Sequence, residues 1–248
     1  MIKISRGPRP PCLTPAFVAQ ETAKYISTDQ TVWNVKELKE ALLKFSSSKC
    51  AYCEVSLQIG PAYMEVEHFY AKAIHKNRVL DWDNLLPSCK RCNLAKGVWD
   101  VAIIGQDIID PTLLSPRGHI RFDSAYRPVG TTPEGINTVF AIHLDDIDRL
   151  GVSRFKLGEK IKRKLEELDD VYRSLGPTAT YQKKGATIRR IKNLLAKCRS
   201  DQPFSAVAAT VLFRSAEYAS MKASLEANGD WDPELDDLNS VVQASALV

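Results

Sequence analysis

The stretch that decides the fold lies between residues 50 and 96 and contains CAYC at 50–53, EHF at 67–69 and DNLLPSCKRCNLAK at 83–96. Two C-x-x-C pairs bracket a histidine that follows a carboxylate, and one asparagine lies on each side of the second pair. Because each C-x-x-C turn can direct two thiolates at one ion, the pairs together predict a tetrahedral structural zinc site. Its ligands would be Cys50, Cys53, Cys89 and Cys92. A closed four-thiolate sphere leaves no open position, so we do not expect this zinc to be the catalyst.

The length and composition are those of a protein that buries a real core: 248 residues, of which 44% are hydrophobic. This length allows one large domain, or a small domain with a substantial partner domain. No apolar run approaches the length of a membrane span, and the first residues lack the apolar core of a secretory signal. We therefore expect a cytoplasmic protein without a membrane partner, in which the six cysteines stay reduced.

Charge is distributed unevenly along the chain. Residues 153–200 carry 14 Lys/Arg and 5 Asp/Glu, whereas residues 201–248 carry 2 Lys/Arg and 8 Asp/Glu. This asymmetry predicts a basic surface for a polyanion and an acidic tail with a different role. The alternative is an ordinary solvated helix face, because Glu and Lys alternate along part of the basic segment.

Periodicity predicts two strands and a helix around the cysteines. We expect a helix over residues 35–45, a strand over 64–69, a second strand or tight loop over 81–86, and a helix from 89 to 98 capped by Ser88. A unit of this size has little core of its own, so zinc must help to hold it together.

The rest of the chain is predicted to be mainly helical. Residues 1–30 are rich in proline and lack a clear period, which favours an extended arm. Apolar residues that recur every three or four positions predict helices after residue 150, and the last dozen residues are expected to fray. The expected elements are short strands over 119–123 and 125–128 and helices over 157–175, 188–198 and 204–213.

The residues between the cysteine pairs suit phosphodiester hydrolysis, which needs a base for water and neutralisation of charge at phosphate. His68 is the natural base, since neutral imidazole can accept a proton near pH 7. Glu67 and Asn93 offer oxygen ligands for a hard ion such as Mg²⁺, and Glu65, on the same strand face, competes with Glu67. Asn84 is better placed to tie down the loop that carries His68.

Two basic residues near the second pair are candidates for nucleic-acid contact. Lys96 follows Asn93 by three positions and shares its helix face, from which it could reach a phosphate. Arg91, beside the cysteines, would also offset the negative charge of the cluster. Taken singly, each candidate has a structural alternative: His68 could be a packing residue, Asn84 a turn cap and Glu67 a solvated strand residue.

The whole pattern, Cys-x2-Cys, Glu-His, Asn-Leu and Cys-x2-Cys-Asn-x2-Lys-Gly, resembles the HNH endonucleases. The more specific wording Val-Glu-His-Phe and Trp-x-Asn-Leu-Leu-Pro-Ser-Cys is similar to one subfamily, the PtuB-type nucleases of retron and Septu antiphage systems. The resemblance implies a zinc-pinned ββα-metal fold, with His68 as general base and Asn84 as the orienting middle residue. It further implies Glu67 and Asn93 as ligands of a catalytic Mg²⁺ or Mn²⁺, and a PtuA-type ATPase as partner.

We therefore expect an α+β, mainly α, chain in three parts. Residues 1–46 would form an N-terminal arm and helix, residues 47–110 the HNH domain with its zinc site, and residues 111–248 short strands followed by a basic helical region. The chain has neither G-x4-G-K-[ST] nor G-x-G-x-x-G, so a nucleotide-driven switch would lie in the ATPase.

The leading functional interpretation is a metal-dependent DNA endonuclease of antiphage defence. No base-reading module is visible, so backbone contact by the basic segment would suffice and sequence preference would be low. A ribonuclease acting on tRNA or another RNA is the second interpretation, although an aromatic-rich stacking sheet is not evident. A non-catalytic zinc-stabilised module that binds nucleic acid or a partner is the third.

Overall fold

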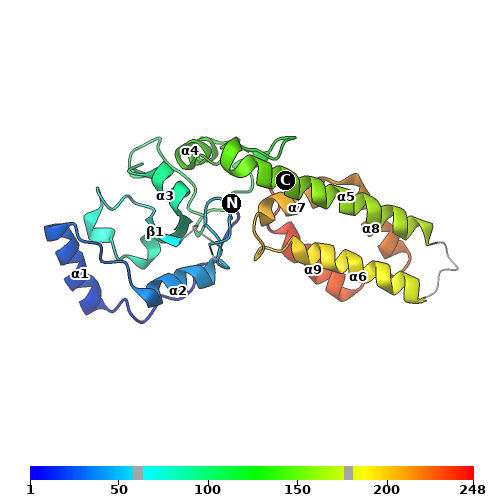
Figure 1. Cartoon of the computed structure of the whole chain (residues 1–248), viewed down its shortest axis with the longest axis horizontal. Helices are drawn as coiled ribbons and strands as arrows, with labels where there is room; N and C mark the ends of the chain where they lie inside the picture. Colours follow the sequence, from blue (N-terminus) through cyan, green and yellow to red (C-terminus); the bar gives the residue numbers. More distant parts are fainter. Residues whose placement is uncertain (58–63, 176–180) are drawn as a thin grey trace. The chain divides into compact units, whose positions relative to one another are not determined.

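The computed structural model describes residues 1–57, 64–175 and 181–248, and these residues form two compact units (Figure 1). The N-terminal unit comprises residues 1–120 and 128–146, and the C-terminal unit comprises residues 121–127 and 147–248. Helices dominate and the strands are short, which confirms the predicted α+β, mainly α, class. The division into residues 1–46, 47–110 and 111–248 stays a prediction.

The elements follow one another in a regular order along the chain. They are α1 (Pro15–Thr28), α2 (Lys36–Phe45), β1 (Met64–His68), η1 (Lys76–Arg78), η2 (Trp82–Asn84), β2 (Leu85–Cys89), α3 (Lys90–Lys96), β3 (Ile120–Phe122), β4 (Pro128–Gly130), α4 (Pro133–Ile142), η3 (Ile147–Gly151), α5 (Val152–Ser174), α6 (Tyr181–Lys197), α7 (Ser205–Arg214), α8 (Ala216–Ala227) and α9 (Pro233–Gln243).

The expected ββα unit is present in the N-terminal unit. Strands β1 and β2 pair antiparallel, with Met64 opposite Cys89 and His68 opposite Leu85. Helix α3 follows β2 directly and contacts both strands. The second strand begins at Leu85, because a turn of 3-10 helix occupies the three residues before it. The predicted cap is wrong: Cys89 is the N-cap residue of α3, and its side chain makes no capping hydrogen bond.

The prediction of an extended arm over residues 1–30 is also wrong, because α1 takes up much of it. The Thr14 side chain accepts a hydrogen bond from the backbone N–H of Phe17, and Pro15 occupies the first helical position. A threonine cap followed by proline is a favourable helix start, because proline needs no hydrogen-bond acceptor there and its φ already suits the helix.

Helices α1 and α2 provide apolar cover for the sheet. Tyr25 of α1 and Leu42 of α2 belong to the same buried cluster as Val66 of β1 and Leu85 of β2. At roughly 25 cal/mol per Å² of apolar surface removed from water, such contacts are the main stabilising term available to a sheet this small. The residues before Cys50 are therefore part of the core that carries the ββα unit.

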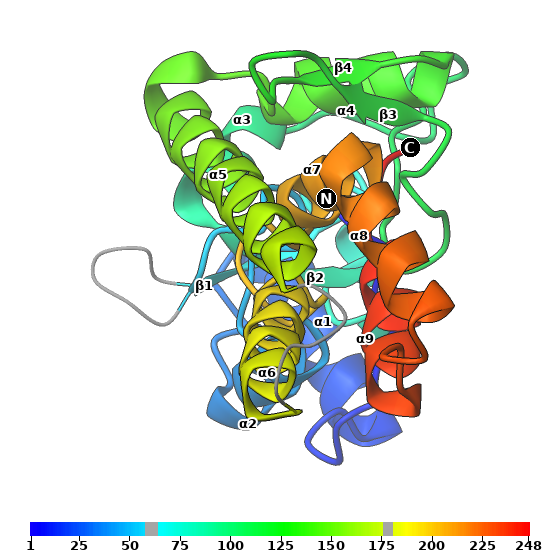
Figure 2. The ribbon, with the colours of Figure 1, turned by 90° about the vertical axis from the view of Figure 1, so that its right-hand side faces the viewer.

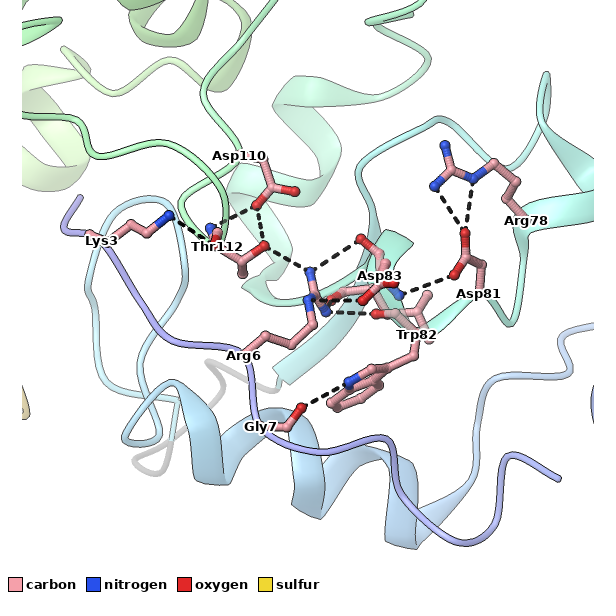
Figure 3. A network of polar contacts seen from close by, with 10 residues as sticks. Lys3, Arg6, Gly7, Arg78, Asp81, Trp82, Asp83, Asp110 and Thr112 are labelled. Carbon is pink, nitrogen blue, oxygen red and sulfur yellow. Dashed lines mark hydrogen bonds and ion pairs between the residues drawn. The ribbon is translucent and has the colours of Figure 1, made fainter.

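Arg6 fastens the first residues of the chain to the turn before β2 (Figure 3). Its guanidinium donates to the backbone oxygens of Trp82 at 2.6 Å, Leu85 at 2.7 Å and Asp83 at 3.2 Å. The indole N–H of Trp82 donates in return to the Gly7 carbonyl at 3.0 Å. One cation thus satisfies several carbonyls of an irregular turn, and charge-assisted hydrogen bonds of this kind are stronger than neutral ones.

The C-terminal unit is built around the long helix α5, which contacts α6, α7 and α8, while α6 also contacts α9. Figure 2 faces this unit and shows α5 and α6 to the left of α8 and α9. Leu165 and Leu168 of α5 and Leu195 of α6 are fully buried. The expected helices are present, and α7 is buried along most of its length, as its alanine-rich sequence predicts.

The end of the chain is ordered rather than frayed. Helix α9 begins with the Asp232 carboxylate accepting the Leu235 N–H, again with proline at the first position. Beyond the helix, the backbone N–H of Leu247 donates to the Thr210 hydroxyl at 2.9 Å, and Leu247 is buried. Among the described residues, no helix combines the length and the apolar character that crossing a membrane requires.

Replacing Arg6 tests the fastening of the turn. Arg6→Ala leaves buried carbonyls without their donor, so we expect the free energy of unfolding to fall by about 2–3 kcal/mol. Urea unfolding followed by tryptophan fluorescence measures this change. The matched control is Arg9→Ala, which alters an exposed arginine three residues away. Equal stability losses in the two variants would contradict the role assigned to Arg6.

Candidate functional site

Four cysteine side chains gather at one end of the β1–β2 sheet. Cys50 and Cys53 lie in a tight turn, in which the Glu54 N–H donates to the Cys50 carbonyl at 3.0 Å. Cys89 ends β2, and Cys92 lies in the first turn of α3. The Ala51 N–H donates to the Pro87 carbonyl at 2.9 Å, which holds the turn beside the strand.

The sulfur positions fit a zinc ion. All four thiols are free and buried, and their sulfur atoms lie within 4.8 Å of one another. The Sγ atoms of Cys53 and Cys89 are 3.7 Å apart. Four sulfurs at about 2.3 Å from a central ion in tetrahedral geometry are separated by about 3.8 Å. The cluster is therefore compatible with a structural zinc that joins the turn, the strand and the helix.

His68 ends β1 at the opposite end of the strand from Met64, which is paired with Cys89. Its Nε2 lies 3.0 Å from the Val79 carbonyl, whereas Nδ1 is buried and bonds to none of the described residues. Burial, followed by the charge of Lys72, lowers the pKa of His68 to about 3. The imidazole is therefore neutral at pH 7. Because a carbonyl can only accept, the proton resides on Nε2 and the lone pair on Nδ1.

Asn84 holds the loop between His68 and β2. Its side-chain oxygen accepts the Tyr70 N–H at 2.7 Å, and its amide nitrogen donates to the carbonyls of Tyr70 at 3.2 Å and Arg78 at 3.0 Å. The side chain is completely buried. These bonds fix both ends of the segment that supplies the Val79 carbonyl to His68. The geometry matches the tying role that the sequence suggests for Asn84.

Glu67 and Lys96 form a pair inside the unit. The Lys96 ammonium lies 2.8 Å from the Glu67 carboxylate and donates to the His68 carbonyl at 2.8 Å. Both side chains are buried, at 3% and 0% exposure. Burial raises the pKa of Glu67, and the charge of Lys96 opposes that rise. A contact between Lys96 and phosphate would require breaking both of its hydrogen bonds, whereas Arg91 lies exposed on α3.

The structure brings Asn93 together with Glu65. The Asn93 amide donates to the Glu65 carboxylate, and both residues line a cavity of about 310 Å³. The choice between Glu65 and Glu67 was open from the sequence, because a period of two puts both on one strand face. Lys96 occupies Glu67, which leaves Glu65 as the strand carboxylate that faces the cavity with Asn93.

Two further residues of this cavity were missed by the sequence reasoning. Trp33 packs edge-on against His68, with ring centroids 4.8 Å apart, and lines the cavity. Lys72 lies over Trp33 at 5.3 Å from the ring centroid and lines the same cavity. A lysine four positions after the motif histidine was a signal available for Lys72. Trp33 precedes the cysteines, in a segment to which the motif assigns nothing.

The comparisons with known proteins agree with this geometry. The HNH endonuclease family matches residues 50–98, which include the cysteines, His68, Asn84 and Asn93. The Septu protein PtuB of Bacillus thuringiensis is 35% identical over 232 residues, covering 93% of this chain and 89% of the relative. The chain belongs to the PtuB family. A second PtuB, from Bacillus mycoides (strain KBAB4), is 35% identical over 71 residues, covering 23% of this chain and 24% of that relative.

Membership in this family, together with the HNH domain, identifies the chain as a nuclease, a hydrolase of phosphodiester bonds. The predicted recognition and enzyme class are thereby confirmed. The individual roles of the site residues remain predictions.

Loss of one thiol tests the zinc site. We expect Cys89→Ser to abolish zinc binding and to unfold the ββα unit, because metal binding contributes folding free energy in small metal-stabilised units. Zinc content measured by mass spectrometry and circular dichroism report the two effects. Cys12→Ser, which changes a thiol outside the cluster, should retain one zinc per chain. A native, zinc-free Cys89→Ser protein would show that zinc has no structural role.

Proposed function

We propose that this chain cleaves DNA phosphodiester bonds in a reaction that depends on Mg²⁺ or Mn²⁺, as the nuclease of an antiphage defence system. The main support is one arrangement: a neutral, buried histidine beside a cavity that a carboxylate and an asparagine line from neighbouring elements. The family match supplies the reaction class. Defence is inferred from the resemblance to Septu proteins.

In the proposed reaction His68 accepts the proton of the attacking water through Nδ1. This atom carries the free lone pair, because Nε2 donates to Val79. A buried acceptor without a partner costs about 1–3 kcal/mol, so a water bonded at Nδ1 would relieve that cost. Asn84 acts as a positioning residue, since it fixes the segment from Tyr70 to Arg78 and through it the orientation of the imidazole.

Glu65 and Asn93 are the proposed ligands of the catalytic ion. A carboxylate oxygen and an amide oxygen are ligands that Mg²⁺ accepts, and turning the Asn93 amide by half a turn would present its oxygen beside Glu65. The ion would neutralise charge at the phosphate and at the leaving oxygen. Glu67, assigned as ligand by the family resemblance, could take part only by giving up its pair with Lys96.

Lys72 is the proposed phosphate contact at the cavity. It is half-buried, lines the cavity, and its charge already acts on His68 and Glu67. Lys96 would act indirectly, by holding Glu67 and the His68 carbonyl. Arg91, exposed on α3, remains a candidate for contact with the nucleic-acid backbone.

A PtuA-type ATPase is the proposed partner. The relatives are named Septu proteins, and this chain contains neither of the two glycine-rich nucleotide-binding patterns sought in its sequence. A switch driven by a nucleotide would therefore act on the nuclease from the partner.

Replacing the proposed base tests the function. In a plasmid-nicking assay with Mg²⁺ or Mn²⁺, we expect His68→Ala to slow cleavage by about 10²–10⁴-fold, the usual contribution of general-base catalysis. Zinc content should stay at one per chain. The control is His143→Asn, an exposed histidine whose left-handed backbone (φ 51°) asparagine also adopts.

Two outcomes of this assay would overturn the proposal. Normal cleavage by His68→Ala would exclude His68 as the base. Absence of cleavage by the zinc-loaded wild type, alone and together with the co-expressed ATPase, would favour a binding module. Parallel assays with RNA decide between the two nucleic acids.

The two glutamates can be separated by measuring metal dependence and stability together. We expect Glu65→Gln to raise the Mg²⁺ concentration needed for half-maximal cleavage about tenfold or more, with little change in stability. Glu67→Gln should instead lower the free energy of unfolding by about 3–5 kcal/mol, because it leaves the Lys96 ammonium buried without its counter-charge. The reverse pattern would make Glu67 the ligand. Metal titrations of cleavage and urea unfolding provide the two readouts.

A further inference from the structure

A groove in the C-terminal unit lies between α5 and α6, two helices that contact each other (Figure 1). Its volume is about 530 Å³, and basic residues line both sides. The α5 side contributes positions 160, 163, 164 and 167, and the α6 side contributes positions 190, 193, 194 and 197. Both sets have the i, i+3, i+4, i+7 spacing of one helix face, so the two helices present matched stripes to one groove.

The charge of these stripes is strongly positive. Lys160, Arg163 and Lys164 of α5 face Arg190 and Lys197 of α6, and the acidic member of the lining is Glu167. Glu167 pairs with Lys164 at 2.7 Å and also with Arg190.

The three remaining cations are exposed and unneutralised. Within residues 1–57, 64–175 and 181–248, Lys160, Arg163 and Lys197 make no ion pair. Groove residues Ile161 and Leu194 belong to the buried core, which keeps the helix faces in place.

The acidic end of the chain neutralises other basic residues of α6 and leaves this groove charged. Lys192 pairs with both Asp232 and Glu234, at the start of α9. Lys184 lies 3.8 Å from the Asp230 carboxylate. The tail thus has a partner within its own unit, and the cations on the groove side of α6 are those without one.

We propose that the α5–α6 groove binds the phosphodiester backbone of a nucleic acid, which rests on the proposed function and gives it a substrate-holding surface. One stripe, from position 160 to 167, extends about 10 Å along the helix axis. Phosphates of one strand are spaced by about 3.4 Å, so this length faces about three of them, which matches three free cations.

The lining contains cations and a single amide, Asn193. Contacts of this kind position a nucleic acid without reading its sequence. The groove therefore suits a nuclease with little sequence preference. An acidic protein surface is the competing occupant, and the test below includes it.

Binding of a labelled 30-base-pair DNA duplex, measured by fluorescence anisotropy over a range of salt concentrations, tests the proposal. The full-length, zinc-loaded chain carries His68→Ala throughout, so that the duplex stays intact. We expect the triple variant Lys160→Glu, Arg163→Glu, Lys197→Glu to bind at least about tenfold more weakly. The slope of log affinity against log salt should fall by about 2–3, because each lost phosphate contact removes about 0.9.

Two further variants guard against trivial effects. Glutamine at the same three positions should lower affinity in the same direction while disturbing the fold less. The matched control reverses three exposed lysines of the N-terminal unit, Lys24, Lys36 and Lys44, with the same change in net charge. Equal weakening by the control would show a general charge effect and overturn the proposal, as would absence of binding by the parent protein at low salt. Competition by polyglutamate as strong, per charge, as that by DNA would favour an acidic protein partner and overturn it too.

Single-stranded DNA and duplex RNA in the same assay identify the source of the backbone. Hydrolysis of bis(4-nitrophenyl) phosphate, a small diester that needs no groove, separates the two proposals. Cleavage of this diester and of DNA with unchanged affinity in the triple variant would refute the groove alone. Groove-dependent DNA binding without hydrolysis of any diester would refute the proposed function alone.

Discussion

The geometry of four buried sulfur atoms is the constraint on which the nuclease unit depends. The strands β1 and β2 have five residues each, and α3 has seven, so the ββα unit has too few apolar residues to hold itself together. The thiol cluster joins a turn, a strand end and a helix start at one point. The register that follows puts His68 opposite Leu85 at the other end of the strands. Zinc chemistry and hydrolytic chemistry are therefore separated along one short sheet.

Around this frame, the site is built from buried polar groups that satisfy one another. Asn84 binds backbone on both sides of the loop after β1, and Lys96 holds Glu67 together with the His68 carbonyl. Removing one member of such a network leaves another buried polar group without a partner, which costs more than the bond itself contributes. The cavity then needs few residues that face it directly, since these supporting groups set the directions in which those side chains point.

The sequence predicted what depends on local spacing and failed where tertiary contacts decide. The cysteine pairs, strand β1 and the later helices follow from spacing and periodicity, and the order of His68, Asn84 and Asn93 identified the HNH class. The same reasoning could not choose between Glu65 and Glu67, because the choice depends on Lys96 reaching across from α3. Helices α1 and α9 were missed although each starts with a capping residue followed by proline, Thr14-Pro15 and Asp232-Pro233. Proline content suggested irregular chain, whereas here it marks the first helical position.

Arg6, α1 and α2 also bear on how such a nuclease can be moved between proteins. The region that carries the family signature, residues 50–98, takes its apolar cover from Tyr25 and Leu42 and the anchor of its η2 turn from Arg6. Excised alone, that region would expose the covered face of its sheet to water. Its reactive residues are therefore inherited as a unit together with a sequence that carries no recognisable motif. Grafting the signature onto another scaffold would require transplanting that silent segment as well.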